Sequence, residues 1–180
     1  MGYGPQPTPA VRPAHAGDAA SCAEIYAPYV RETAITFELD PPSGQEMADR
    51  MAAAARRHAW LVVERDGLVA GYAYGAPMHA RAAYRWSCEV SVYLDCEHRG
   101  EGLGRALYEA LLPALAGRGF RMAIAGMTLP NEASEGLHRA MGFQPIGVYR
   151  RIGYKLGAWH DVAWVQRALG EGPDPPPETS

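Results

Sequence analysis

The sequence predicts an α/β or α+β fold, in which a mixed sheet of about seven strands is flanked by about four helices. Three observations carry this prediction. Segments of strand character and segments with apolar residues at helical spacing follow each other along the chain. Pairs of consecutive strand segments form hairpins toward both ends of the sheet. The order strand, helix, helix, three strands, helix, strand, helix, two strands also departs from the regular alternation of a doubly wound fold.

The first segments are expected to form a strand, a helix and a loop. "AVRPA" (10–14) reads as a short strand. Asp18 is placed to cap a helix that runs through Tyr26 to about Arg31. The stretch "TAITFELDPPS" (33–43) reads as a loop with an extended centre, because its two prolines stop any regular element.

A second helix and a hairpin follow this loop. Ser43 opens a helix that continues through Met51 to Ala55. "AWLVVER" and "LVAGYAYGAP" are strand-like segments joined by the turn Asp66-Gly67. An Asp-Gly turn between two apolar segments is a strong short-range hairpin signal.

The C-terminal half is expected to alternate strands and helices before a closing hairpin. A strand spans roughly Tyr84 to Leu94, and a helix with apolar residues at Leu107 and Leu111 runs to about Gly117. The remaining elements are a strand at 121–127, a helix from Asn131 to Met141 that Gly142 stops, and strands at 144–153 and 160–169.

The bulk properties limit the classes of function. The chain of 180 residues has a formal net charge of -3, which argues against a nucleic-acid binder, and it has no apolar run of about 18 residues that would span a membrane. The three cysteines show no CxxC spacing, so no disulfide framework and no metal site is expected, and a cytoplasmic location fits best. Pro- and Gly-rich residues 1–9 and 170–180 are expected to be disordered tails of a single domain, residues 10–169.

The stretch "CEHRGEGLGRALYEALL" combines a glycine-rich loop with the start of a helix. Gly100, Gly102 and Gly104 alternate between Arg99 and Arg105. Backbone amides at a helix start bind anions, and arginines add charge-assisted hydrogen bonds to phosphate oxygens. The spacing matches neither GxxxxGK[ST] nor GxGxxG. Two interpretations stay open on these residues alone: an anion-binding loop, or an ordinary glycine turn before a helix.

The pattern Arg99-x-x-Gly102-x-Gly104 after "VSVYLDCEH" resembles the acetyl-CoA pyrophosphate loop of the GNAT superfamily of N-acetyltransferases. "RPA", "ITFE", "WLVVERDG", "GYAYGAP", "ARAAYRWSCEVSVYL", "LPNEASEGLHRAMGF" and "GYKLGAWHDVAWVQ" are similar in order and spacing to the phosphinothricin acetyltransferase family. This resemblance covers almost the whole chain between the two tails. It implies a GNAT-like acyl-CoA N-acyltransferase fold, acetyl-CoA as acetyl donor and coenzyme A as product.

The resemblance also implies which residues bind the cofactor. The backbone of Val92, Tyr93 and Leu94 would pair with the pantetheine arm like an added strand. Asn131 and Ser134, on the following helix, would contact the cofactor, although Asn131 also fits a plain helix cap. The pyrophosphate would lie in the loop formed by Arg99, Gly100, Glu101, Gly102, Leu103, Gly104 and Arg105.

By the same resemblance, Glu89 is the general base and His138 the second catalytic residue. An α-amine is mostly an ammonium ion at neutral pH, so a base must remove a proton, and partial burial of Glu89 would raise its pKa and strengthen it. The backbone amide of Val92 would stabilise the oxyanion. His138 would protonate the leaving thiolate or order the proton path. A lone histidine on a helix also fits a structural role, and Cys88 faces away from Glu89 as core packing.

The implied acceptor is a small amino acid with an oxygen-rich tetrahedral side chain, such as phosphinothricin, methionine sulfoximine or methionine sulfone. Arg81 could clamp a carboxylate or phosphinate, although it also fits an ordinary surface arginine. The implied acceptor-binding residues are Phe37, His79, Ala80, Arg81, Tyr84, Glu89, Val90 and Ser91.

The chain departs from the family pattern on the expected acceptor side. It has "MHAR" where family members often have "WKAR", Arg85 where a relative has Asp before the strand tryptophan, and Ala27-Pro28 in the first helix. These departures leave the cofactor assignment in place and the identity of the amine open.

Other functions remain as alternatives. The same fold and cofactor could serve a protein N-terminus or a polyamine, but the aromatic loop around Phe37 favours a covered pocket over a peptide groove. A non-catalytic acyl-CoA-binding module would lack Glu89 or His138, and both are present. The aromatic C-terminal strands are expected to support a homodimer. The sequence does not separate detoxification from self-resistance.

Overall fold

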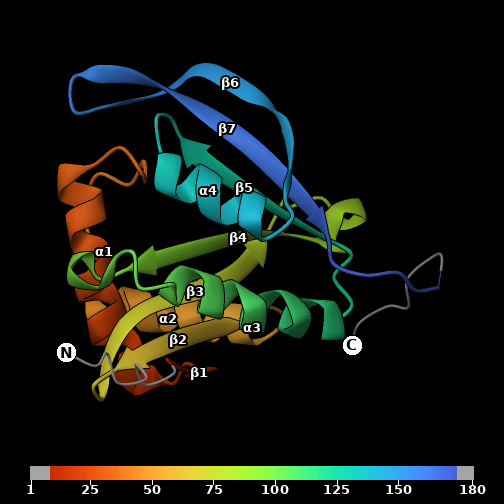
Figure 1. The fold of residues 1–180 in the computed structure, drawn as a ribbon, viewed down its shortest axis with the longest axis horizontal. Helices are drawn as coiled ribbons and strands as arrows, with labels where there is room; N and C mark the ends of the chain where they lie inside the picture. Colours follow the sequence, from red (N-terminus) through yellow and green to blue (C-terminus); the bar gives the residue numbers. More distant parts are fainter. Residues whose placement is uncertain (1–8, 174–180) are drawn as a thin grey trace, which may run out of the picture.

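A computed structural model describes residues 9–173 and contains the expected order of strands and helices (Figure 1). The strands are β1 (Ala10–Pro13), β2 (Trp60–Arg65), β3 (Leu68–Pro77), β4 (Ser87–Leu94), β5 (Met122–Thr128), β6 (Gln144–Lys155) and β7 (Ala158–Ala168). The helices are α1 (Ala19–Glu32), α2 (Gly44–Ala55), α3 (Leu103–Gly117) and α4 (Glu132–Ala140). The fold class predicted from the sequence is confirmed.

The seven strands form one mixed sheet in the order β1-β2-β3-β4-β5-β7-β6. β4 and β5 pair in parallel, and every other neighbouring pair is antiparallel. The parallel register covers Ser87–Glu89 against Met122–Ile124 and then stops, although both strands continue. Beyond Glu89 the two strands therefore diverge and open a gap in the sheet (Figure 1).

The sheet separates two apolar cores because successive strand residues face opposite sides. On one face, α3 buries Leu103, Leu107, Leu111 and Leu115 at helical spacing. On the other face, α1 and α2 pack against the strand residues that point toward them, among them Trp60. β4 follows the same alternation, with Cys88 and Val90 on the α3 side and Tyr93 on the α1 side. The expected facing of β4 is thus confirmed.

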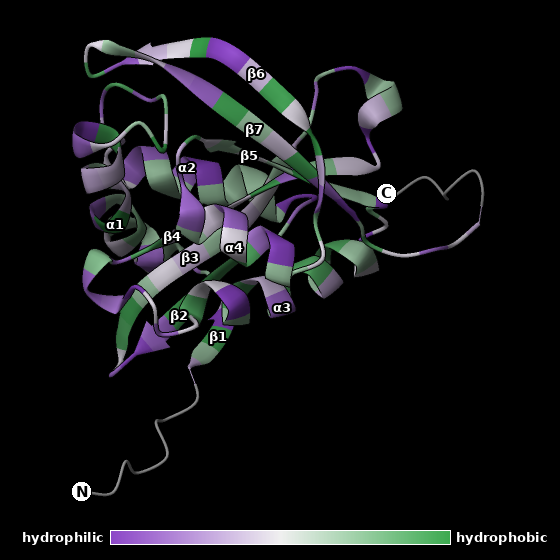
Figure 2. Ribbon diagram, turned by 45° about the horizontal axis from the view of Figure 1, so that its top comes forward, coloured by the Kyte–Doolittle hydropathy of each residue, from purple (hydrophilic) through white to green (hydrophobic). Residues whose placement is uncertain are grey.

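β6 and β7 form a long hairpin that extends past the rest of the sheet (Figure 1). Hydrophobic residues recur along β6, although most of this strand is exposed (Figure 2). The large exposed apolar residues of this hairpin are Ile146, Val148, Tyr149, Ile152, Tyr154, Leu156 and Trp159. A surface of this kind is typical of protein–protein contacts.

Two local expectations differ from the structure. The strand expected from Tyr84 begins at Ser87, because residues 82–84 form a 3-10 turn in which the Arg85 amide donates to the Ala82 carbonyl. Asp18 makes no side-chain cap on α1. Its carboxylate instead accepts two hydrogen bonds of 2.8 Å from the Arg12 guanidinium, which holds the pKa of Asp18 below its usual range. The ion pair with Arg12 on β1 therefore forms in place of the local helix cap.

The expected tails fall partly outside the described residues, since residues 1–8 and 174–180 lie beyond them. The division into a single domain of residues 10–169 stays a prediction. Within residues 9–173, no helix is long and apolar enough to cross a membrane. The same part of the chain holds no cluster of three or more His, Cys, Asp or Glu side chains arranged for a metal ion.

Candidate active site

The glycine-rich loop leaves the first turn of α3 open. Gly100 and Gly102 adopt left-handed backbone angles, with φ of 82° and 80°, which side chains other than glycine rarely adopt. A Cβ atom built on either glycine would meet nothing within 4 Å. Gly102 occupies the N-cap position and offers no capping side chain, so the first amides of α3 face the open space beside the loop. These amides suit an anion.

The charged side chains of this loop contact different neighbouring residues and do not converge on one point. The Arg99 guanidinium lies 5.1 Å from the centre of the Tyr29 ring. Arg105 pairs with Glu109 at 2.8 Å, and Glu101 pairs with Arg65 at 3.3 Å. Both arginines thus lie beside the open amides without being buried.

Gly104 lets two helices approach closely. A Cβ atom on this glycine would lie 3.2 Å from a methyl carbon of Leu137 on α4. This contact brings α4 beside the start of α3. Asn131 caps α4, because its side-chain oxygen accepts a hydrogen bond of 3.1 Å from the Ser134 amide, as the sequence predicts.

The gap between β4 and β5 contains a small cleft of about 50 Å³. It brings together residues that the sequence assigned to three different roles. The cleft-lining residues among them are Val90, Ser91, Val92, Tyr93, Asn131, Ser134 and His138. Because β4 lacks a neighbour on this side beyond Glu89, its backbone edge is available to an extended, amide-bearing ligand.

His138 is buried and hydrogen-bonded through both ring nitrogens. Its Nδ1 lies 2.8 Å from the Ser134 carbonyl oxygen, and its Nε2 lies 3.1 Å from the Tyr108 hydroxyl. A carbonyl oxygen can only accept, so Nδ1 carries the proton and Nε2 accepts from Tyr108. Burial lowers the pKa of His138 and raises that of Tyr108. At neutral pH the pair is therefore uncharged.

Glu89 lies at the last paired position before the strands diverge. Its backbone faces Ala76 on β3 and Ile124 on β5. Its side chain lines a second cavity of about 310 Å³, which it shares with Phe37 and Trp164. Desolvation by burial raises the pKa of Glu89. A carboxylate with a raised pKa is a stronger base than an ordinary glutamate.

Cys88 is not positioned as a nucleophile. Its side chain is fully buried on the α3 face, and burial raises the pKa of its thiol to about 12. Because the thiolate is the reactive form, this cysteine is inert.

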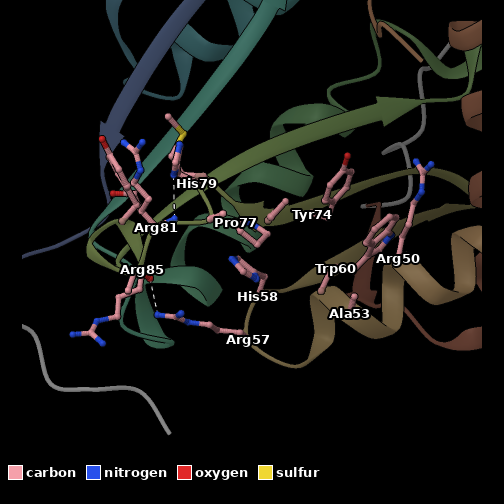
Figure 3. A pocket seen from close by; sticks show the side chains of 18 of the residues that line it. Arg50, Ala53, Arg57, His58, Trp60, Tyr74, Pro77, His79, Arg81 and Arg85 are labelled. Atoms are coloured by element: carbon pink, nitrogen blue, oxygen red, sulfur yellow. Dashed lines mark hydrogen bonds between the residues drawn. The ribbon is translucent and has the colours of Figure 1, made fainter. Parts of the chain in front are cut away.

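The expected acceptor residues divide between cavities. His79, Ala80, Arg81 and Tyr84 line the largest cavity, about 620 Å³ in volume (Figure 3). His79 accepts a hydrogen bond of 3.1 Å from the Arg81 amide. Phe37 and Glu89 line the second cavity, and Val90 and Ser91 the small cleft.

Tyr74 connects the lining of the largest cavity with the surroundings of Glu89. It lines the largest cavity, while its hydroxyl forms a hydrogen bond with Ser91 and lies close enough to Glu89 for the carboxylate to raise the tyrosine's pKa. Burial is the larger cause of that raised pKa. The cavities that Tyr74, Glu89 and Ser91 line therefore lie close to one another.

Sequence reasoning missed three tyrosines of the site. Tyr74 and Tyr108 sit at apolar positions of a strand and a helix, where an aromatic residue reads as core. Tyr29 donates a hydrogen bond of 2.7 Å to the Leu94 carbonyl and so fixes the end of β4 from the α1 side. Their hydroxyl partners come from distant segments, so sequence spacing carries no signal for them.

The strands of the sheet diverge next to the open start of a helix. This arrangement indicates the class of acyl-CoA-dependent N-acyltransferases. The family description "Acetyltransferase (GNAT) domain" matches residues 11–164. The chain therefore belongs to the GNAT acetyltransferase family, and the expected enzyme class and acetyl-CoA dependence are confirmed.

The relatives include enzymes with named acceptors. The phosphinothricin N-acetyltransferase of Streptomyces viridochromogenes is 41% identical over 166 residues, which cover 92% of this chain and 90% of that protein. The L-methionine sulfoximine/L-methionine sulfone acetyltransferase of Salmonella typhimurium is 31% identical over 172 residues, covering 89% and 95%. A phosphinothricin acetyltransferase from Sinorhizobium meliloti, solved with acetyl-CoA, has a TM-score of 0.88 and 40% identity over 92% of this chain and 90% of that one.

Proposed function

We propose that this enzyme acetylates the α-amine of a small amino acid such as phosphinothricin, methionine sulfoximine or methionine sulfone. The observation that carries the proposal is the position of Glu89, a half-buried carboxylate with a raised pKa at the point where β4 and β5 part. The names of the relatives at 41% and 31% identity support this acceptor class. Detoxification and self-resistance would both use this reaction.

The residues present fit acetyl-CoA. The open β4 edge of Val92, Tyr93 and Leu94 suits an amide-bearing arm, and the cradle over Gly100 and Gly102 has room for a pyrophosphate. The remaining residues proposed to contact the cofactor are Arg99, Glu101, Leu103, Gly104, Arg105, Asn131 and Ser134. Bound acetyl-CoA supplies a thioester carbonyl as the acetyl donor.

Glu89 removes the proton that blocks the acceptor amine. An ammonium group has no lone pair for attack, and the raised pKa of Glu89 brings the carboxylate closer to the pKa of the amine. The proton passes to a carboxylate oxygen directly or through one water. The free amine then attacks in a single displacement, without an acyl group on the protein.

Val92 and the pair Tyr108–His138 complete the proposed catalytic site. The Val92 amide donates to the oxygen on which negative charge develops. His138 stays neutral and holds the Tyr108 hydroxyl at 3.1 Å. Since a hydroxyl hydrogen rotates about its C–O bond, Tyr108 can turn it toward the leaving sulfur. His138 thus orders the proton path rather than donating as an imidazolium.

Arg81 binds the acidic end of the acceptor. It lines the same cavity as His79, Ala80 and Tyr84, and the exposed arginine is free to turn toward a carboxylate or phosphinate. Phe37, Val90 and Ser91 close the acceptor site around Glu89. The lining of the largest cavity includes several arginines and, among the described residues, no carboxylate, which disfavours a polyamine.

We also propose that the enzyme is a cytoplasmic homodimer. The exposed apolar residues of the β6–β7 hairpin offer a surface for a second copy. The three cysteines are free thiols, which fits a reducing compartment.

Release of coenzyme A from acetyl-CoA tests the acceptor class. The panel consists of phosphinothricin, methionine sulfoximine, methionine sulfone, spermidine and a short peptide. Turnover on the first three with little on the others supports the proposal. Turnover confined to spermidine or the peptide overturns the acceptor and keeps the enzyme class.

A further inference from the structure

The largest cavity extends well beyond the residues proposed to hold the acceptor's α-carboxylate. Its volume of about 620 Å³ lies within the range of about 300 to 1,000 Å³ that is usual for pockets that bury drug-sized ligands. Its lining extends from residues 77–87, along α2, to the start of β2 (Figure 3). A short amino acid leaves much of this space unfilled.

One wall of the cavity is aromatic. The Trp60 ring stacks on Tyr74 with centroids 4.3 Å apart and on Tyr72 at 5.3 Å, and both pairs are nearly parallel at 11°. Ala53, which lies beside Trp60 (Figure 3), and Ala54 add small side chains to the same lining. A flat aromatic group packs well against a wall of this kind.

The cavity lining includes a buried polar atom without a hydrogen-bond partner among the described residues. His58 is 4% exposed, and its Nε2 has no hydrogen-bond partner within the described residues. Its ring stacks on Phe120 at 4.7 Å, which fixes its plane. Figure 3 shows His58 among the labelled cavity residues, with Trp60 on one side and Arg81 on the other. Buried polar atoms are normally hydrogen-bonded, so an unpartnered one beside a cavity points to a ligand group.

The cavity lies next to the proposed reaction centre along β4. Ser87 lines the cavity, and Glu89 is the next residue on the same face of the strand. Tyr74 lies in the cavity wall and also beside Glu89. An amine at Glu89 can therefore belong to a molecule whose side chain enters the cavity.

We propose that the preferred acceptor is an α-amino acid with an aromatic side chain that ends in a hydrogen-bonding group, and that His58 selects it. The carboxylate meets Arg81, the aromatic ring enters the cavity that Trp60 lines, and the polar end of the side chain meets His58 Nε2. This inference rests on the proposed N-acetylation of an α-amine and names, as the preferred acceptor, an amino acid with a longer side chain than those named above.

L-Tyrosine and L-phenylalanine form the matched test pair, because they differ by one hydroxyl at the far end of the ring. The wild-type enzyme is expected to show a kcat/KM about tenfold higher for tyrosine, as one good hydrogen bond to a buried group gives. His58→Leu should bring the two values within about twofold, while His58→Gln, which keeps a polar atom near Nε2, should retain part of the preference. Equal values in the wild type, or an unchanged preference in His58→Leu, overturn the proposal.

A second variant tests the space itself and does not touch the buried histidine. Ala53→Phe places a ring in the cavity from an exposed helix position. The ratio of kcat/KM for tyrosine to that for methionine sulfone should fall at least about fivefold, because the longer side chain needs the space that the new ring fills. An unchanged ratio contradicts the proposal.

Calorimetric titration separates this inference from the proposed function. Tyrosine and phenylalanine are titrated into the protein saturated with coenzyme A. If no amino acid is acetylated, tighter tyrosine binding that His58→Leu abolishes still supports the ligand class, while the acetylation proposal fails. If methionine sulfone is acetylated but tyrosine neither binds nor reacts, the acetylation proposal stands and this inference fails.

Discussion

The Nε2 atom of His138 lies 3.1 Å from the hydroxyl oxygen of Tyr108, and both side chains are buried between α3 and α4. The carbonyl oxygen of Ser134 fixes the other ring nitrogen of His138 at 2.8 Å. His138 of α4 is thus tied to a tyrosine from another helix. The two side chains therefore form one hydrogen-bonded pair at the small cleft between β4 and β5.

Tyr108→Phe removes the hydroxyl and leaves His138 Nε2 without its partner. We expect kcat to fall at least about tenfold, because the proton path to the leaving sulfur is lost. The dissociation constant of acetyl-CoA, measured by calorimetry, should stay within about twofold, since the tyrosine ring remains in the core. A kcat equal to that of the wild type would remove Tyr108 from the mechanism.

Gly102→Val forces a branched side chain into a backbone with a φ of 80°. The loop must then leave its left-handed conformation, at a cost of about 1 to 2 kcal/mol, and the cradle changes shape. We expect the KM for acetyl-CoA to rise at least tenfold with a smaller change for the acceptor. Gly117→Ala at the other end of α3 is the control, because Gly117 does not have a left-handed φ and a Cβ there meets nothing within 4 Å. Equal acetyl-CoA KM values in both variants would contradict the loop assignment.

Lys155 ties the end of β6 to the loop before α2. Its amine donates a hydrogen bond of 2.7 Å to the Thr36 carbonyl, and the side chain is buried. Phe37, the next residue, packs against Gly153 so closely that no side chain fits there. Lys155→Met should release this loop and raise the acceptor KM several-fold, with the acetyl-CoA KM nearly unchanged. Steady-state kinetics with each substrate varied in turn distinguishes this from a general loss of structure, which would change both constants.

The two buried histidines make stability depend on pH. Burial, together with Arg57 and Arg118, lowers the pKa of His58 from 6.5 to about 4, and burial also lowers that of His138. The unfolded chain therefore binds more protons than the folded one once the pH drops below about 6.5, so the free energy of unfolding falls with falling pH. We expect a loss on the order of 2 kcal/mol between pH 7 and pH 4.5 from urea unfolding.

His58→Gln should reduce this pH dependence, because it removes one of the two groups. The variant is compared with the wild type at the same series of pH values. An identical slope in both proteins would show that His58 protonates equally in the folded and unfolded states.

The fold was predictable where local patterns decide it. The Asp66-Gly67 turn between two strands and the helix start at Ser43 both form as expected. The Ser43 hydroxyl accepts a hydrogen bond of 3.2 Å from the Glu46 amide. Asp18 shows the limit, because Arg12, six residues earlier on β1, takes the carboxylate that the local cap would use. A capping pattern in the sequence does not report such a competing partner.

The candidate site followed the same division. Gly102 and Asn131 could be placed from their positions at helix starts. The pairing of Tyr108 with His138 and the cavity that His58 lines depend on the packing of α2, α3 and α4. Residues of this kind read as core from sequence, since burial and partners are tertiary properties.

The acid limb of the pH profile reports the proposed base. Glu89 must be ionised to accept a proton, and its pKa is raised by burial, so kcat/KM should rise with pH through a value above that of an ordinary glutamate. Glu89→Asp should keep an acid limb at lower activity. A profile with no acid limb above the pKa of an ordinary glutamate, measured where the wild type is folded, would leave Glu89 without this role.

The most direct test of the account is Glu89→Gln, because it keeps the shape of the side chain and removes the base. We predict that kcat falls about a hundredfold or more while the dissociation constant of acetyl-CoA stays within about twofold. Glu97→Gln, at an exposed carboxylate beside the loop, serves as the matched control and should retain wild-type turnover. Turnover in Glu89→Gln equal to that of Glu97→Gln would contradict the assignment of Glu89 as the base.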